Sequence, residues 1–171
     1  FASRALSGNC AAIGAGRWRL GGGADGSFVL ATNLPTVFNG TVGTAYVVRC
    51  TISCAPGPAA TDYVNITCNQ NPTASAAGPD QTGAAICGLT SVTLAGNSPA
   101  IGTGSWSIVS GAGGSFVLAT NPTTVFNGTA GTAYVLRWTI SNAPCTASTD
   151  DVNITFHQNP TASAAGPYKT G

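Results

Sequence analysis

Apolar and polar residues alternate with a period of two along much of the chain. In AYVLRWTIS, residues 133–141, every second position is large and apolar, namely Tyr134, Leu136, Trp138 and Ile140. The segment DVNITF, 151–156, alternates in the same way, and the intervening NAPCTASTD combines proline with small polar residues typical of a hairpin loop. We therefore expect half-buried β-strands. No window offers a useful length of the 3.6-residue stripe of an amphipathic helix.

Further strands are predicted upstream, each bounded by glycine-rich turns. They are SVTLA (91–95), SWSIV (105–109), SFVLA (115–119) and TTVFN (123–127). Adding TASAAG (73–78) as a leading strand gives about seven short strands with a turn every 8 to 12 residues, which is typical of an immunoglobulin-like sandwich. The predicted fold class is all-β, with tandem immunoglobulin-like β-sandwich domains arranged head to tail.

The chain contains an internal duplication. NPTASAAGPDQTG at 71–83 returns as NPTASAAGPYKTG at 159–171, an offset of 159 − 71 = 88, and GSFVLATN and VNIT recur at the same offset. Residue 1 thus aligns with residue 89. We predict that 1–70 is a repeat lacking its leading strand, 71–158 a complete repeat, and 159–171 the leading strand of a following repeat. Either the chain is an excerpt of a longer covalent array, which we favour, or its tail completes the front of another molecule.

Charge is unusually scarce in this sequence. Only 6% of the 171 residues are charged, against a usual share of about 25%, and the formal net charge is +1. Solubility must then rest on small polar residues, as is common in secreted β proteins. The near-zero charge and the lack of a basic patch argue against nucleic-acid binding. No apolar run reaches the 18 or more residues of a membrane-spanning helix.

Catalytic and metal-binding patterns are absent from the sequence. GGGADG, 21–26, has the spacing of a nucleotide-binding loop, but it joins two predicted strands and no helix follows to receive a phosphate. His157 is the sole histidine and lies on the outward side of its strand, without partners for a zinc site or a triad. We predict no catalytic residue, no metal site and no cofactor.

Large aromatic residues mark the expected core. Trp18 and Trp106 occupy equivalent places in the third strand of each copy, where a buried tryptophan commonly anchors a sandwich. Tyr46, Tyr134 and Trp138 are predicted to face the same interior. Two N-x-T sequons in predicted turns, Asn39 and Asn127, are candidate glycan attachment sites.

Six cysteines in a weakly charged β protein indicate an oxidising compartment. In the first copy, Cys50 and Cys68 take the places of Trp138 and Phe156, so both should face the core, either as a buried pair or as small apolar residues. Cys10 and Cys54 lie in loops predicted to share one end of the sandwich. They are the candidate disulfide of this copy.

The second copy resembles a known group of repeats. AGPDQTG followed by a cysteine, then VTLAGNSPAIGTGSWSIVSGAGGSF and YVLRWTISNAPCTASTDDVNITF, is similar to tandem PKD-like or Ig-like repeats in very large surface proteins of Bacteroidota. Those proteins are commonly exported by type IX secretion and associated with adhesion and gliding. The resemblance implies an extracellular, cell-surface location and a disulfide between Cys87 and Cys145. In an immunoglobulin sandwich these positions lie at opposite ends, so the pair requires a different route for the leading segment.

The expected function is structural. The chain would be a repeat of an extracellular stalk or adhesin-type filament, with neighbouring copies of itself, in the same chain or in adjacent subunits, as partners. One alternative is a carbohydrate-binding module that meets a surface glycan through its glycine-rich loops and Tyr63 or Tyr168. Another is a pilus-like subunit that polymerises by strand exchange, because a sandwich without its leading strand exposes a sheet edge.

Overall fold

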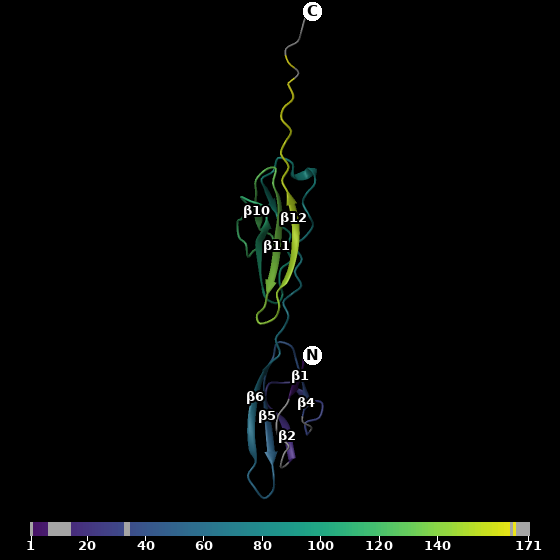
Figure 1. Ribbon diagram of the computed structural model, residues 1–171, viewed down its shortest axis with the longest axis vertical. Helices are drawn as coiled ribbons and strands as arrows, with labels where there is room; N and C mark the ends of the chain where they lie inside the picture. Colours follow the sequence, from purple (N-terminus) through teal and green to yellow (C-terminus); the bar gives the residue numbers. More distant parts are fainter. Residues whose placement is uncertain (1, 7–14, 33–34, 165, 167–171) are drawn as a thin grey trace, which may run out of the picture. The chain divides into compact units, whose positions relative to one another are not determined.

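The computed structural model describes residues 2–6, 15–32, 35–164 and 166 (Figure 1). The chain divides into two compact units, Phe1–Gln70 (unit 1) and Asn71–Gly171 (unit 2). Each unit is a β-sandwich built from two antiparallel three-stranded sheets. The predicted all-β, immunoglobulin-like fold is confirmed.

Unit 1 contains six strands in its described residues. One sheet has the order β1-β4-β3 and the other the order β2-β5-β6. The strands are β1 (Ala2–Leu6), β2 (Ala15–Gly22), β3 (Ser27–Phe28), β4 (Thr36–Gly40), β5 (Ala45–Ser53) and β6 (Ala60–Thr67).

Unit 2 repeats this arrangement and adds one turn of 3-10 helix. Its sheets have the orders β7-β10-β9 and β12-β11-β8. The elements are η1 (Ala84–Ile86), β7 (Ser91–Thr93), β8 (Thr103–Ser110), β9 (Ser115–Phe116), β10 (Val125–Asn127), β11 (Ala133–Ser141) and β12 (Ser148–Thr155).

The core of unit 2 is aromatic. Trp138 is fully buried, and its ring centroid lies 5.0 Å from that of Trp106. Tyr134 meets Phe126 edge to face at 5.0 Å, and its hydroxyl donates to the carbonyl of Ala112 at 2.7 Å. Its apolar ring is thus buried while its polar end is bonded. This packing holds the two sheets together.

One glycine makes room for the central tryptophan. A Cβ atom at Gly104 would lie 2.2 Å from Cζ2 of Trp138, far inside the distance that real carbon atoms adopt. The indole ring therefore packs directly on the backbone of β8. Only glycine at this position allows the two strands to keep both their pairing and the large side chain.

Unit 1 has the same core with smaller residues at two places. Trp18 and Tyr46 are 7% and 2% exposed, so the aromatic positions named from the sequence are inside in this unit as well. Cys50 and Cys68 stand where unit 2 has Trp138 and Phe156, and they are 6% and 7% exposed, whereas the two aromatic residues are at 0%. At these two positions unit 1 buries smaller side chains than unit 2 does.

Two details differ from the sequence-based expectation. The segment 73–78 is extended but belongs to no sheet, because much of its backbone bonds to side chains, as described below. Asn39 and Asn127 are not in turns: Asn39 lies within β4 and is half-buried, and Asn127 is the last residue of β10. Glycosylation at either site stays an untested prediction.

Candidate functional site

The segment 71–83, called the leader here, runs along the free edge of β12. Gln81 forms a parallel bridge with Ile154. Its N–H donates to the carbonyl of Asn153 at 2.8 Å, and its own carbonyl accepts from the N–H of Thr155 at 3.0 Å. The leader thereby extends the sheet that contains β12.

Side chains of β12 bind the rest of the leader. The N–H of Ala77 donates to Oδ2 of Asp150 at 2.7 Å. The carboxylate of Asp80 accepts from the N–H of Asn153 at 2.8 Å and from its Nδ2 at 2.9 Å. Asp80 and Asn153 thus form a bidentate contact between the leader and the strand.

The leader also contacts the other sheet and its connecting loop. The side chain of Asn97 donates to the carbonyl of Ala74 at 2.9 Å and accepts from the N–H of Ala76 at 2.9 Å. Nε2 of Gln81 donates to the carbonyl of Thr93 at 3.0 Å. Ala77 is only 1% exposed and belongs to the core of unit 2. The leader therefore closes the open side of the sandwich by bonding to both of its layers.

Gly78 is required where the leader changes its bonding partners. Its φ of +88° lies in the region that L-residues with a side chain rarely adopt. A Cβ atom there would also lie 2.8 Å from the carbonyl oxygen of Ala95. The glycine lets the leader turn from contacts with side chains to backbone pairing with β12.

In unit 1, none of the described residues occupies the corresponding place. Val64 on β6 is 37% exposed, whereas Val152, its equivalent on β12, is 1% exposed. A cavity of about 400 Å³ lies between β1 and β6, and we call it the edge groove. Its lining residues are Arg4, Ala5, Leu6, Val64, Asn65, Ile66, Thr67 and Asn69.

Counterparts of three residues that hold the leader line the edge groove. Subtracting 88 from Thr93, Asn153 and Thr155 gives Ala5, Asn65 and Thr67. All three line the groove. The groove thus lies in unit 1 at a place that corresponds to part of the leader's position in unit 2.

Acid should loosen the leader of unit 2. Hydrogen bonds from the backbone and side chain of Asn153 hold the pKa of the Asp80 carboxyl below its ordinary value of 3.8. Such a carboxylate stabilises the folded state at pH values above the pKa that it has in the unfolded chain. This stabilisation is lost as the pH falls through the lower pKa of the folded state. We therefore expect the unfolding free energy of unit 2 to fall as the pH drops below about 4.

The measurement is denaturant unfolding of the full chain at a series of pH values, followed by hydrogen exchange of β12 amides. Asp80→Asn should reduce the stability of unit 2 at neutral pH and flatten its dependence below pH 4, leaving the contribution of Asp151. Asp25→Asn, which removes one carboxyl from unit 1, is the matched control. An Asp80→Asn profile identical to that of the unsubstituted chain would contradict the assigned role of Asp80.

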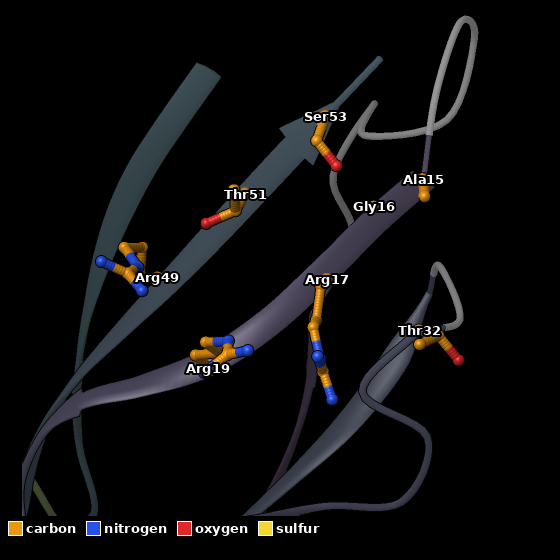
Figure 2. A pocket seen from close by; sticks show the side chains of 8 residues that line it. All are labelled: Ala15, Gly16, Arg17, Arg19, Thr32, Arg49, Thr51 and Ser53. Atoms are coloured by element: carbon orange, nitrogen blue, oxygen red, sulfur yellow. The ribbon is translucent and has the colours of Figure 1, made fainter. Parts of the chain in front are cut away.

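A second candidate site is a cationic face on the sheet β2-β5-β6. Arg19 on β2 lies directly opposite Arg49 on β5, and Arg17 lies two residues before Arg19 on the same side of its strand. Figure 2 shows the three arginines beside a pocket of about 640 Å³, together with Ala15, Gly16, Thr32, Thr51 and Ser53. Like charges directly opposite one another destabilise a sheet. The three positive charges therefore favour the binding of an anion at this face.

Unit 2 neutralises the corresponding face. Arg137, the equivalent of Arg49, donates from Nε and Nη2 to the carboxylate of Asp151 at 2.7 and 2.8 Å. This hydrogen bonding holds the pKa of Asp151 below its usual value. In unit 1 the place of Asp151 is taken by Tyr63, and serines stand in unit 2 where unit 1 has Arg17 and Arg19. The cationic face is thus specific to unit 1.

The cysteines do not form the predicted pairs. Cys87 and Cys145 are both free. Cys87 bridges His157 beyond the end of β12, and Cys145 lies in the β11–β12 hairpin at the other end of that strand (Figure 1). Eight residues of strand span about 26 Å, whereas the Cα atoms of a disulfide lie within about 7 Å. The separation of the two ends of the sandwich explains why this pair is wrong.

The first copy departs from expectation as well. Cys54 is free and exposed, so the Cys10–Cys54 pair is not formed, and Cys10 itself lies outside the described residues. Cys68 is buried and free, which fits the interpretation as a small apolar residue. Cys50 is disulfide-bonded. The inward position of Cys50 and Cys68 was predictable from the strand alternation, but the pairing was not.

The remaining candidates from the sequence form no site among the described residues. His157 is exposed, and its Nε2 lies 3.0 Å from the carbonyl of Thr82 in the leader. Tyr63 is 58% exposed on β6, while Tyr168 lies outside the described residues. Within the part of the chain that the structure describes, no three His, Cys, Asp or Glu residues group as a metal site. No helix in that part is long and apolar enough to cross a membrane.

Sequence reasoning missed two features. The first is the set of side-chain bonds that hold the leader, made by Asp80 within it and by Asn97 and Asn153 outside it. Short polar residues in a loop or strand give no sign of such long-range bonds. The cationic face had a visible signal: Arg17 and Arg19 are two residues apart, so a strand places them on one side. The pairing of that strand with Arg49 was needed to show the cluster.

Among known proteins, the chain is similar to solved structures only. No protein-family model and no curated protein sequence matches the chain. Among solved structures, the PKD domain from the KIAA 1837 protein is 21% identical, with a TM-score of 0.44, over 54% of this chain and 92% of that domain. Protocadherin Gamma B2 extracellular cadherin domains 3-6 are 8% identical, with a TM-score of 0.39, over 84% of this chain and 44% of theirs. Mouse Cadherin-23 EC22-24 is 12% identical, with a TM-score of 0.35, over 85% of this chain and 53% of that structure. The chain spans about half the length of the cadherin fragments and nearly all of the PKD domain, and these neighbours are PKD and cadherin sandwiches.

Proposed function

We propose that the chain is a non-catalytic structural repeat of an extracellular stalk or filament, of the kind that displays an adhesin at the cell surface. The observation that carries the proposal is the way one repeat leads into the next. β6 ends at Thr67 and the leader begins at Asn71; β12 ends at Thr155 and nearly the same sequence begins again at Asn159. Such a short connection, followed in both places by a proline, restricts bending between successive sandwiches.

Composition supports an extracellular setting for this role. Few charges, many small polar residues and six cysteines are typical of secreted β proteins. The resemblance of the second copy to repeats of Bacteroidota surface proteins extends the proposal to that group and to export by type IX secretion. In such an array each repeat adds length, and chemistry is left to other parts of the protein.

Two measurements test the structural role. Antibodies raised against the chain should label filaments outside intact cells of the source organism in immunogold electron microscopy. Covalent arrays of two, four and six copies should appear as rods whose length grows in proportion to copy number. Label confined to the cell interior, or arrays that collapse into globules, would overturn the proposal.

A second function is favoured by the cationic face of unit 1. Arg17, Arg19 and Arg49 lie on one sheet surface, and Nε of Arg49 is buried without a hydrogen-bond partner. An extracellular polysaccharide bearing sulfate or carboxylate groups would satisfy these guanidinium groups. This is the carbohydrate-binding alternative, located on a sheet face instead of on the glycine-rich loops.

Converting the face to its unit 2 counterpart should abolish this binding. In the double variant Arg17→Ser and Arg19→Ser we expect at least a tenfold loss of affinity for an immobilised sulfated polysaccharide, which corresponds to about 1.4 kcal/mol. Arg4→Ser with Lys169→Ser is the control, since it removes the same two charges from other places. Binding should also weaken with salt. Equal losses in both double variants would show that net charge alone is responsible.

A further inference from the structure

We propose that Tyr63 stacks on a sugar ring of an acidic polysaccharide bound at the cationic face of unit 1, with the acidic group of that sugar held by Arg19 and Arg49. The inference rests on the polysaccharide binding proposed above and deepens it, because it names the residue that recognises the sugar itself. Charge alone attracts any polyanion. An aromatic ring beside the charges favours a polyanion that also has a ring to stack.

Tyr63 lies beside the guanidinium groups on the outer side of the sheet β2-β5-β6. Strand pairing places Arg49 directly between Arg19 on β2 and Tyr63 on β6. Residues directly opposite one another on a sheet face have Cβ atoms about 5 Å apart. Tyr63 is therefore next to the pocket that Arg19 and Arg49 line, although it is not itself part of that lining.

The ring of Tyr63 reaches across the sheet and stays accessible. A Cβ atom added at Gly21 on β2 would lie 3.9 Å from Cε1 of Tyr63, although β5 separates β2 from β6. The ring therefore extends over β5 toward β2. Tyr63 is nevertheless 58% exposed. An aromatic ring that is held across a sheet and remains open to solvent offers an apolar surface to the C–H groups of a sugar.

This accessibility does not depend on the edge groove. In unit 2 the leader is bound along β12, where Asp151 is the counterpart of Tyr63, and 38% of the Asp151 side chain is exposed. On either side of Asp151, the leader bonds to Asp150 and Asn153. An occupied leader position therefore leaves this part of the outer sheet face open.

The aromatic ring and the space beside it occur in unit 1 only, as Arg17 and Arg19 do. Unit 2 has Asp151 in place of Tyr63 and Val109 in place of Gly21. Val109 is 50% exposed, so it occupies the outer surface at the position that glycine leaves free in unit 1. The changes between the two copies thus bring charge, an aromatic ring and free space together on one sheet face.

The same face contains polar groups that lack partners within the protein. Nε of Arg49 and Oγ1 of Thr51 are buried without a hydrogen-bond partner. Figure 2 shows Arg19, Arg49 and Thr51 on two neighbouring strands around the pocket. Guanidinium groups bind sulfate and carboxylate oxygens, and a threonine hydroxyl can pair with a sugar hydroxyl. The acidic group and the ring of one sugar can thus be bound side by side.

A single-stranded nucleic acid also combines negative charge with rings that stack, but it suits this face less well. Proteins that bind single strands follow the phosphates along an extended cationic groove. The chain has only six Lys and Arg residues, and three of them are the arginines of this face. The hydroxyl side chains of Thr32, Thr51 and Ser53 line the same pocket, which suits a ligand rich in hydroxyl groups.

The test measures binding of the full 171-residue chain to dextran sulfate by calorimetry at several salt concentrations. Tyr63→Ala should lower the affinity by about three- to tenfold, the size of one aromatic contact, and by the same factor at each salt concentration. Tyr63→Phe retains the ring and should bind as the unsubstituted chain does. The double variant Arg17→Ser and Arg19→Ser should instead weaken the salt dependence, because it removes charge.

Three further ligands separate the ring from the charge. Poly(vinyl sulfate) is a polyanion without sugar rings, so Tyr63→Ala should bind it as tightly as the unsubstituted chain does. Polygalacturonate carries carboxylates in place of sulfates and therefore tells which acidic group the face accepts. Whichever of the two sugar polymers binds should show the loss with Tyr63→Ala. A thymidine oligonucleotide should bind more weakly than either of them.

Each outcome decides the inference. Equal affinities of Tyr63→Ala and the unsubstituted chain for the sugar polymers would overturn it, and a loss in the arginine double variant would then leave the proposed polysaccharide binding intact. A similar loss with poly(vinyl sulfate) would also overturn it, since no sugar ring is present there. Tighter binding of the oligonucleotide that depends on Tyr63 would assign the ring to a base. An unsubstituted chain that binds neither sugar polymer would overturn both the inference and the binding function.

Discussion

Replacing Ala77 with arginine should destabilise unit 2 by about 3 kcal/mol, the upper end of what overpacking a core normally costs. Ala77 is 1% exposed and packs into the core, and its N–H is bound by Asp150. The long cationic side chain cannot remain there unpaired. The leader must then leave the sandwich edge, and Val152 becomes exposed as Val64 is in unit 1.

The neighbouring residue provides the control. Ala76 is exposed, and its contact with Asn97 is made by the backbone, so Ala76→Arg should change the stability by less than about 0.5 kcal/mol. Hydrogen exchange of β12 amides in increasing denaturant reports on unit 2 by itself. Equal stabilities for the two variants would show that the leader contributes little to the fold.

The strands were predictable because their chemistry is local. Alternation along 133–141 placed Tyr134, Leu136, Trp138 and Ile140 on one side, and the same four residues are buried in β11. The duplication then extended this prediction to the other copy, where the equivalent strand, β5, has the same length. A period of two is a direct consequence of strand geometry, so one sequence suffices to detect it.

The bonding partners of the leader could not be predicted in this way. TASAAG, at residues 73–78, was expected as a strand, yet its partners are side chains of Ser148, Asp150 and Asn97, which lie between 21 and 73 residues away along the chain. Contacts at that separation depend on the assembled sandwich. The wrong Cys87–Cys145 pair has the same origin, because a disulfide needs the positions of both ends and the sequence supplies only their order.

The two candidate sites could also be predicted from the sequence only in part. An exposed edge in unit 1 is a prediction from the register of the duplication. The groove residues themselves became identifiable only by comparison of β6 with β12. The cationic face needed the cross-strand partners of Arg19 and Arg17, together with the observation that unit 2 replaces them with serine. Small polar differences between two copies of one fold are therefore the most informative feature of this molecule.

Truncation of Trp138 should have the largest effect of any single core substitution. The side chain is fully buried and packs on Trp106, so Trp138→Ala should cost about 3 to 5 kcal/mol in the unfolding free energy of unit 2. Arg137→Ala, on the opposite side of the same strand, removes a solvent-exposed ion pair and should cost no more than about 1 kcal/mol. Hydrogen exchange of β11 amides in denaturant measures both. Similar losses in the two variants would contradict the central role of the indole.

A double-mutant cycle tests whether Gly104 is needed to make room for the indole ring of Trp138. Gly104→Ala alone should destabilise unit 2, because the new Cβ would lie 2.2 Å from Cζ2 of Trp138. In the Trp138→Ala background the same substitution finds a cavity, so its cost should vanish or reverse. The two residues are in contact, and a coupling of at least about 1 kcal/mol is therefore expected. Additive losses would mean that Gly104 is needed for its backbone conformation and not for the space it gives to the ring.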